Sequence, residues 1–282
     1  MTNTRVGLLH PGEMGASIGA AARAAGTSVC WASAGRSDAS RRRAAEAGVE
    51  DVHTLAALAA RSHVILSVCP PEAARSLAES VLGTGFTGIF VDANAVSSAT
   101  ARDLAKTVEA AGGQFVDGGI IGPPAHRQGT TRLYLSGAQA SSVASAFQGS
   151  LLEALVIGPH PGAASALKMS YAAWTKGSAA LLTAIRALAR AEGVETALLE
   201  EWSLSQPGLE ARSAAGTRNN AFKAWRFAGE MREIAATFEA SGLPGGFHGA
   251  AADIFERLVT YKDCDPAPEL PQIIDTILGT RT

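Results

Sequence analysis

The order of apolar segments along the chain is the feature that most constrains its fold. Up to about residue 158, short runs rich in Val, Ile and Leu alternate with alanine-rich segments of helical periodicity. The expected strands are residues 5–9, 28–31, 64–68, 89–91, 114–116, 131–135 and 155–157. The expected helices between the first five strands are residues 15–25, 40–47, 54–60, 71–81 and 98–111. This alternation predicts βαβ units and a mostly parallel sheet that is covered on both faces.

After residue 158 the strand pattern ends and only helical patterns remain. Residues 159–162 form a proline and glycine cluster, and residues 163–191 can be read as one long helix. Further helices are expected at residues 196–205, 209–214, 221–241, 246–261 and 270–278. We therefore expect an α/β domain over residues 1–158 and an all-helical domain over residues 159–282.

The composition excludes several classes of protein. The chain has 282 residues, of which 47% are hydrophobic and 18% charged, which argues against disorder and against a coiled coil. A net charge of -2 gives no basis for a nucleic-acid partner. No apolar run predicts a membrane span, and the early first strand leaves no room for a signal peptide. Three scattered cysteines suggest reduced thiols with no metal site, so we expect a cytoplasmic protein.

The first strand leads into a tight turn and a helix within VGLLHPGEMGASIGAAARAAG. Gly12 and Gly15 occupy the second and third positions of the fingerprint GxGxxG, whereas the first position is His10. The second glycine allows the backbone to approach a pyrophosphate, and the third allows helix and strand to pack closely. We expect this turn to bind a dinucleotide through His10, Pro11, Gly12, Glu13 and Met14. The alternative is a glycine turn in some other α/β protein.

The residues after the second strand indicate which dinucleotide is bound. An NAD-binding domain usually places a carboxylate there to bind the ribose hydroxyls. This chain instead has Ser33, Arg36 and Ser37, followed by three arginines at residues 41–43. Hydroxyl and guanidinium groups favour a 2′-phosphate, so NADP is the expected cofactor and NAD the less favoured one. Alternatively, the three consecutive arginines form part of a solvated helix face.

Several motifs occur in the order that is typical of β-hydroxyacid dehydrogenases. They are the first turn, SVCPP at 67–71, DANAVS at 92–97, FVDGGIIGPP at 115–124, and residues 158–168. Together they cover the chain from residue 6 to about 180. The later segments YAAWTKGSAALL and FAGEMREIAATF resemble a subgroup whose C-terminal helical domain has no assigned function. The chain thus resembles the 6-phosphogluconate dehydrogenase and β-hydroxyacid dehydrogenase superfamily.

The resemblance implies a catalytic lysine near the start of the long helix, and Lys168 matches that position. Hydride transfer to or from a carbinol carbon needs a group that gives or takes the hydroxyl proton. The alternative is a lysine whose ammonium group reaches solvent from an apolar helix. The family usually has Asn four residues later, where this chain has Ala172. Tyr171 and Thr175 share a helix face with Lys168 and could replace that polar contact.

Other candidate contacts follow from the same resemblance. Val68, Cys69, Pro70 and Asn94 are expected to line the cofactor groove. Ser97 is expected at the substrate, together with the loop that carries Ile121, Gly122 and Pro123 and with Thr175. This loop stands where the family has Ser-Gly-Gly, so it lacks a hydroxyl that would hold a carboxylate. We therefore expect a bulkier or less polar substrate than a small 3-hydroxy acid.

In the helical domain, six residues could face a substrate cleft, and three of them have a simpler explanation. Glu230 and Glu233 are one helical turn apart, and such a pair is usually exposed to solvent. His248 follows two glycines at a helix start and is more often a capping or packing residue than a catalyst. Arg218, Asn219 and Trp225 are further candidates.

These observations predict an NADP-dependent oxidoreductase that acts on a carbonyl or alcohol, with Lys168 as general acid and base. Two alternatives are an imine reductase on the same architecture and a regulatory protein that binds NADPH without turnover. Related imine reductases generally lack the lysine, which favours the first reading. The expected partners are a small-molecule substrate and a second copy of the chain, which would form a homodimer through the helical domain.

Overall fold

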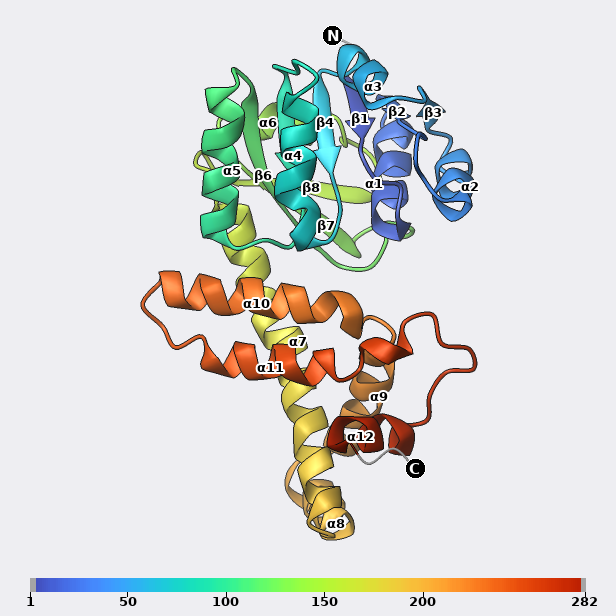
Figure 1. The fold of residues 1–282 in the computed structure, drawn as a ribbon, viewed down its shortest axis with the longest axis vertical. Helices are drawn as coiled ribbons and strands as arrows, with labels where there is room; N and C mark the ends of the chain where they lie inside the picture. The colour runs from blue at the N-terminus through green and yellow to red at the C-terminus, as the bar shows by residue number, and fades with distance from the viewer. Residues whose placement is uncertain (1–3, 280–282) are drawn as a thin grey trace. The chain divides into compact units, whose positions relative to one another are not determined.

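The computed structural model describes residues 4–279 and shows two compact units. The units divide between Met169 and Ser170, inside a long helix, α7 (Ala163–Ala191). The division falls further along the chain than the expected boundary at residue 158. Figure 1 shows the strands gathered in the first unit and only helices in the second.

The first unit is built on one eight-stranded sheet in the order β3-β2-β1-β4-β5-β6-β7-β8. All neighbouring strands are parallel except β6 and β7, which are antiparallel. This confirms the prediction of a mostly parallel sheet. The strands are β1 (Arg5–Leu8), β2 (Ser28–Trp31), β3 (Glu50–Asp51), β4 (Val64–Ser67), β5 (Ile89–Asp92), β6 (Gln114–Ile121), β7 (Thr131–Ser136) and β8 (Leu152–Gly158).

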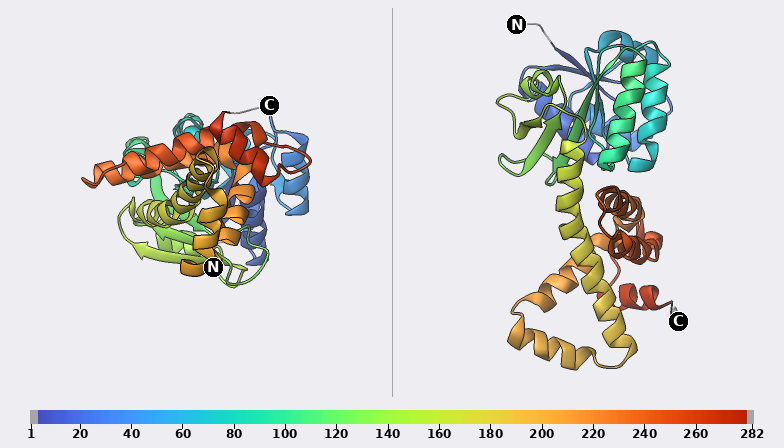
Figure 2. Two further views of the ribbon diagram at one scale, coloured as in Figure 1. Left: turned by 90° about the horizontal axis from the view of Figure 1, so that it is seen from below. Right: turned by 90° about the vertical axis from the view of Figure 1, so that its left-hand side faces the viewer.

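Helices cover both faces of the sheet, as the buried strands require, and Figure 2 shows them on either side of it. One hydrophobic cluster joins the sheet to α1 (Glu13–Ala24), α2 (Asp38–Glu46) and α6 (Ala140–Ser145). A second cluster joins the opposite face to α3 (Leu55–Arg61), α4 (Ala74–Leu82) and α5 (Ser98–Ala110). A 3₁₀ turn, η1 (Pro71–Ala73), precedes α4. The arrangement is that of a doubly wound dinucleotide-binding domain.

Two elements of the first unit were not expected from the sequence. Strand β3 has only two residues, Glu50 and Asp51, and both are exposed, so it carries no apolar pattern. Helix α6 has six residues, of which two are buried. Both are too short to give a reliable periodic signal.

The second unit contains the rest of α7 and five further helices. These are α8 (Glu195–Ser205), α9 (Leu209–Ala221), α10 (Ala224–Ala240), α11 (Gly246–Glu256) and α12 (Leu270–Leu278), with a 3₁₀ turn η2 (Val259–Tyr261). The single helix expected over residues 163–191 is confirmed. Helices α10 and α11 pack side by side, with Phe227 against the edge of Phe255. Among the described residues, no helix has the length and apolar character needed to cross a membrane.

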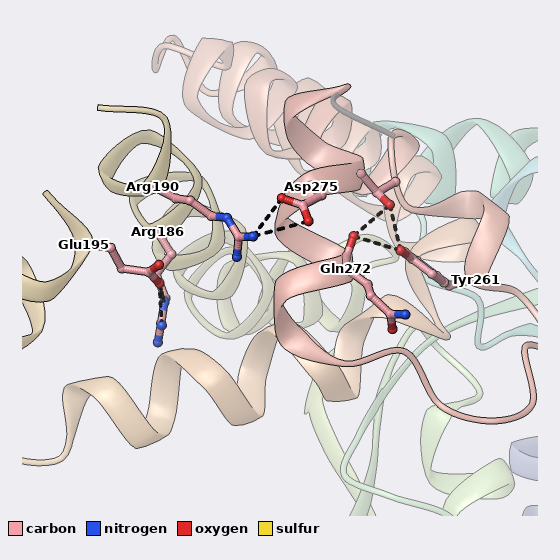
Figure 3. A network of polar contacts seen from close by, with 7 residues as sticks. Arg186, Arg190, Glu195, Tyr261, Gln272 and Asp275 are labelled. Carbon is pink, nitrogen blue, oxygen red and sulfur yellow. Dashed lines mark hydrogen bonds and ion pairs between the residues drawn. The ribbon is translucent and has the colours of Figure 1, made fainter. Parts of the chain in front are cut away.

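Polar contacts tie the C-terminal half of α7 to its neighbours in this unit (Figure 3). The buried guanidinium of Arg186 binds Glu195 at 2.6 Å, at the start of α8. Arg190 binds Asp275 of α12 at 3.1 Å. The Tyr261 hydroxyl donates to the carbonyl oxygen of Gln272 at 3.0 Å. The first two contacts join α7 to α8 and to α12, and the third joins η2 to α12.

Candidate active site

The carboxyl ends of the parallel strands β1, β2, β4 and β5 lie at one edge of the sheet. The sheet order reverses between β1 and β4, and ligands of such sheets bind at this switch point. The loops that follow these four strands carry most of the site residues expected from the sequence. The topology therefore gathers them at one edge.

The turn between β1 and α1 is shaped by its two glycines. A Cβ atom at Gly15 would collide with the carbonyl oxygen of His10, so the close approach of helix and strand requires glycine there. A Cβ at Gly12, the N-cap of α1, would meet nothing within 4 Å, so packing within the protein does not explain this glycine. Among the described residues other than glycine, only His53 and Asp263 have a positive φ. His10 therefore occupies the first fingerprint position without backbone strain.

The side chain of His10 contacts Arg36. The Nη1 atom of Arg36 lies 2.5 Å from the Nε2 atom of His10, across 26 residues of sequence. Burial, together with the positive charge of Arg36, lowers the pKa of His10 to about 4. The imidazole is therefore neutral at neutral pH and accepts a hydrogen bond from the guanidinium. Two of the residues expected at the cofactor thus meet across the first turn.

The three consecutive arginines do not form one solvated face. Arg43 donates from Nε to the carbonyl oxygen of Pro11 at 3.0 Å, and Arg41 donates to the carbonyl oxygen of Ser33 at the same distance. Arg42 is exposed. Ser37 is the N-cap of α2, where its hydroxyl accepts from the backbone N–H of Ser40. Two of the arginines therefore hold the loops at the ends of β1 and β2.

Asp51 lies beside Ser33, and sequence reasoning missed it. The carboxylate accepts from the backbone N–H of His53 at 2.8 Å. Burial alone would raise the pKa of Asp51, but hydrogen bonds from Ser33 and His53 outweigh it and lower the pKa. The Ser33 hydroxyl also lies 3.5 Å from His53 Nδ1. A carboxylate therefore does stand near the end of β2, although it comes from β3 and its oxygens are engaged by the protein.

The loops after β4 and β5 are joined by Asn94. Its Oδ1 atom accepts from the backbone N–H of Cys69 at 2.5 Å, and its Nδ2 atom donates to the Ser67 hydroxyl at 3.1 Å. Asn94 is buried, so its amide orders the two loops. Val68 and Cys69 are half-buried and Pro70 is exposed. Burial raises the pKa of Cys69 to about 12, which makes its thiol a poor nucleophile.

Ser97 and Met14 both have structural contacts within the first unit. Ser97 is the buried N-cap of α5, and its hydroxyl accepts from the backbone N–H of Thr100 at 3.1 Å. Met14 offers its carbonyl oxygen to the Ser17 hydroxyl at 2.9 Å. The same Ser17 oxygen accepts from the backbone N–H of Ala125, which connects α1 to the loop after β6.

Lys168 lies on the second turn of α7 and is half-buried. Its Nζ atom donates to the carbonyl oxygen of Ile120, in β6, at 2.7 Å. This contact depends on Gly119, where a Cβ would lie 2.6 Å from the carbonyl oxygen of Ala164 and 3.2 Å from the Lys168 Cβ. The glycine allows α7 to pack directly on β6. The amine of Lys168 is thereby held against the strand that leads into the expected substrate loop.

Asp117 anchors the start of α7, and sequence reasoning did not identify this role. Its buried carboxylate accepts from the backbone N–H groups of Gly162 and Ser165 at 2.9 and 3.0 Å. It also accepts from the hydroxyls of Ser165 at 2.5 Å and Ser136 at 2.9 Å. A carboxylate is well placed at this helix end because it satisfies N–H groups that have no partner within the helix. Asp117 thus fixes the helix that carries Lys168.

The conformation of the loop after β6 depends on the backbone of Gly122 and Pro123. Gly122 has a φ of 123°, and a Cβ there would collide with the carbonyl oxygen of Thr130. The Thr131 hydroxyl donates to the carbonyl oxygen of Pro123 at 2.6 Å. Ile121 is buried, while Gly122 and Pro123 are exposed.

The site residues expected on the second unit differ in their surroundings. Tyr171 is 47% exposed, and the Thr175 hydroxyl donates to the Tyr171 carbonyl oxygen at 3.3 Å. Both residues lie on α7 at helical spacing from Lys168. No contact of either residue assigns it to a substrate.

A polar cluster lies between α7, α10 and α11 of the second unit. Glu230 is buried and forms an ion pair with Lys176, whose ammonium group also lies 4.5 Å from the centre of the Phe227 ring. The expectation that Glu230 is exposed was therefore wrong, because Lys176 supplies a positive charge from another helix. His248 is buried and packs against Phe238, in agreement with a packing role. Glu233 is half-buried, Arg218 and Asn219 are exposed, and Trp225 is 39% exposed beneath the Lys262 ammonium group.

Sequence comparison shows the family to which the first unit belongs. Residues 5–152 match the NAD binding domain of 6-phosphogluconate dehydrogenase. The chain belongs to this family. Residues 189–258 match a domain of unknown function. The predicted resemblance to the superfamily is thereby confirmed.

One curated relative and three solved structures illustrate the similarity. An uncharacterised protein from Methanothermus fervidus is 30% identical over 171 residues. The match covers 59% of this chain and 63% of that protein, so it spans less than two thirds of the relative's length. A conserved protein of unknown function, reported as structurally similar to 3-hydroxyacid dehydrogenases, has 27% identity and a TM-score of 0.65, covering 91% of this chain and 97% of that one.

Two more distant structures share the fold of the family. The 3-hydroxyisobutyrate dehydrogenase of Mycobacterium tuberculosis, solved with L-serine, has 18% identity and a TM-score of 0.70, covering 99% of each chain. A reductive aminase from Aspergillus terreus, solved with NADPH, cyclohexanone and allyl amine, has 18% identity and a TM-score of 0.57, covering 97% of this chain and 99% of that one.

Proposed function

We propose that the protein is an NADP-dependent oxidoreductase that transfers a hydride between the nicotinamide and the carbon of a carbonyl or alcohol. The observation that carries this proposal is the position of Lys168. Its amine is held 2.7 Å from a backbone carbonyl oxygen on β6, at the carboxyl end of the sheet of a dinucleotide-binding domain. An amine in this place can exchange a proton with a substrate oxygen.

The residues present fit a bound dinucleotide. Gly12 leaves the N-terminus of α1 free of a side chain, and the first N–H groups of a helix favour phosphate. Arg36 stands at the end of β2, and none of the ion pairs in the described part of the chain involves it. A guanidinium without a carboxylate partner suits a 2′-phosphate. The carboxylate of Asp51, near the end of β2, accepts a hydrogen bond from the backbone N–H of His53.

When bound, the nicotinamide supplies or accepts the hydride. In the oxidising direction, a neutral Lys168 takes the proton of the substrate hydroxyl as the C–H bond breaks. In the reducing direction, its ammonium form gives a proton to the carbonyl oxygen. The Ile120 carbonyl oxygen accepts one N–H of the amine, which restricts the directions in which its remaining positions can point. Asn94 and Asp117 order the loops and the helix around this group.

Imine reduction is the second candidate, and one observation favours it. The loop at Ile121, Gly122 and Pro123 offers no side-chain hydroxyl for a substrate carboxylate. A substrate without a carboxylate, such as a ketone or an imine, would suit this loop better. The reductive aminase that shares the fold was solved with a ketone, cyclohexanone, and with allyl amine.

The cofactor part of the proposal is tested by fluorescence titration of the full chain with NADPH and NADH. We expect NADPH to bind at least about tenfold more tightly, equal to about 1.4 kcal/mol. Arg36→Ala should abolish the preference, while Arg42→Ala, at an exposed arginine, should keep it. Binding of neither nucleotide would overturn the proposal. A screen of ketones, hydroxy acids and imines then separates the two reactions.

Assembly is a separate part of the proposal. Three large apolar side chains of the helical unit are strongly exposed: Trp174 at 69%, Leu188 at 61% and Leu204 at 79%. Exposed apolar side chains of this size on α7 and α8 support a homodimer formed through the helical domain. Light scattering after size exclusion should give twice the mass of the chain, and Leu188→Glu should shift it toward the monomer. A monomer at micromolar wild-type concentration would contradict this.

A further inference from the structure

The cation at Arg36 is unusual in its surroundings. Its guanidinium is engaged by a neutral imidazole at His10 instead of by a carboxylate. The Nε atom of Arg36 is buried and has no hydrogen-bond partner among the described residues. Burial lowers the pKa of Arg36, as expected for a cation that the protein does not neutralise. A buried N–H group without a hydrogen-bond partner costs free energy.

The tautomer of His10 follows from the chemistry of its partner. Arginine only donates hydrogen bonds, so the Nε2 atom of His10 must accept from the Nη1 atom of Arg36. A neutral imidazole then carries its proton on Nδ1. This Nδ1 atom is also buried without a hydrogen-bond partner among the described residues. The contact thus leaves two unused donors, one on each residue, beside the turn that approaches a pyrophosphate.

The backbone gives no reason for a histidine at this position. His10 has no positive φ, so the backbone conformation does not require glycine there, although glycine is the usual residue of the fingerprint. What the histidine adds is its side chain. Among the described residues, this side chain makes a hydrogen bond only with Arg36. A role in holding Arg36 therefore accounts for the departure from the fingerprint.

We infer that His10 is a specificity-determining residue, which holds Arg36 at the first turn so that the site selects a dinucleotide with a 2′-phosphate. The inference rests on the proposed NADP-dependent function and adds the residue that sets the preference. His10 acts through Arg36 and is a positioning residue. The hydrogen-bond geometry requires an acceptor at the position of Nε2, which glutamine provides with its Oε1 atom and glycine lacks.

The experiment measures dissociation constants for NADPH and NADH on the full chain. It uses the wild type, His10→Gly, His10→Gln, Arg36→Ala and the double variant His10→Gly/Arg36→Ala. His10→Gly restores the usual fingerprint and should bind NADH within about threefold of the wild type, while its NADPH preference falls by about tenfold. His10→Gln should retain most of the preference. In the Arg36→Ala background, His10→Gly should have no further effect on NADPH, because the two residues act as one unit.

The outcomes separate this inference from the proposed function. If the wild type prefers NADPH and Arg36→Ala removes the preference, but His10→Gly keeps it, the inference is wrong and the proposed function stands. The inference would also be wrong if His10→Gly weakened NADPH binding equally in the protein with Arg36 and in the Arg36→Ala variant. If the wild type shows no NADPH preference, the cofactor proposal itself fails. NADH binding by His10→Gly serves as the check that this variant is folded.

Discussion

The amine of Lys168 lies 2.7 Å from the carbonyl oxygen of Ile120, so the first turns of α7 are joined directly to strand β6. Three other features maintain this contact. Gly119 lets the helix approach the strand, and Asp117 and Ser165 fix the end of the helix. Strand β6 and the first turns of α7 therefore determine where the amine of Lys168 lies.

Replacement of the amine tests the chemical role of Lys168. Lys168→Ala should lower kcat by about 10²-fold to 10⁴-fold, the range of a lost general acid or base, and leave NADPH affinity within about threefold. Steady-state kinetics and fluorescence titration measure the two quantities. Lys106→Ala, at an exposed lysine on α5, is the matched control and should change neither. Undiminished turnover by Lys168→Ala would remove the lysine from the mechanism.

The close packing at Gly119 predicts that adding one methyl group there will lower the stability of the protein. Gly119→Ala places a Cβ 2.6 Å from the carbonyl oxygen of Ala164, so strand and helix must separate. We expect a loss of about 1–3 kcal/mol in the free energy of unfolding and a lower kcat. Gly216→Ala, in α9, is the matched control, because the new Cβ would meet only the Cβ of Ala179 in α7, at 3.9 Å. That change should stabilise the protein by up to about 1 kcal/mol. Similar urea midpoints for the two variants would contradict the packing argument.

The anchor at Asp117 can be tested without removing its volume. Asp117→Asn replaces an acceptor oxygen with an NH₂ group that cannot accept from Gly162 or Ser165. Since the site is buried, we expect a loss of about 2–4 kcal/mol in the free energy of unfolding. Asp103→Asn, at an exposed carboxylate on α5, is the matched control and should have a much smaller effect. Chemical denaturation of both variants provides the measurement, and equal effects would count against the anchor.

Substitutions of Lys176 and Glu230, which form an ion pair, should have non-additive effects on the free energy of unfolding. Glu230→Ala removes the carboxylate from a buried ammonium group and should cost about 3–5 kcal/mol of stability. The double variant with Lys176→Met should recover much of this, because no buried charge remains. Glu256→Ala, at an exposed ion pair with Arg232, should cost less than about 1 kcal/mol. A double-mutant cycle with no coupling would show that the pair contributes nothing measurable.

The neutral His10 makes stability depend on pH in a defined window. Its folded pKa is about 4, against 6.5 for an ordinary histidine, so between these values the unfolded chain binds a proton that the folded chain does not. The stabilisation is present above pH 6.5 and is lost as the pH falls to 4. After allowance for solvent screening, this amounts to roughly 2 kcal/mol.

The check compares wild type with His10→Gln by urea denaturation at pH 7 and pH 4.5. Glutamine does not titrate, so the variant should lose less stability on acidification. The buried His248 also has a lowered pKa, caused by its burial, but it is present in both proteins and cancels in the comparison. Identical losses in the two proteins would show that His10 does not titrate as described.

The sequence predicted the elements with strong periodicity and missed contacts that are distant along the chain. The alternation of strands and helices was sufficient for the parallel sheet, and the uninterrupted pattern over residues 163–191 for α7. Asp117 was not identified because its partners, Gly162 and Ser165, are 45 and 48 residues away. The exposure expected for Glu230 was wrong for the same reason, since its partner Lys176 lies on another helix.

Local motifs indicated which turn is expected to bind the cofactor, but they could not show how its side chains interact. Both His10 and Arg36 were expected at the dinucleotide, yet no sequence rule places one against the other across 26 residues. Asp51 escaped notice because it lies on a two-residue strand without an apolar pattern. The NADP preference, the role of Lys168 and the substrate contacts of Ser97, Tyr171 and Thr175 stay predictions.

The anchoring of α7 by Asp117 also limits where the gene can be cut or recombined. A fragment that stops at residue 158 would delete the two backbone N–H donors and the Ser165 hydroxyl. The buried carboxylate would then keep only the Ser136 hydroxyl among the donors described above. Chimeras that exchange helical domains between relatives should therefore be joined after Met169, so that each nucleotide-binding part keeps its own copy of the first two turns. Such a chimera would keep Lys168 together with the sheet that it contacts, and it would exchange only the helices that follow Met169.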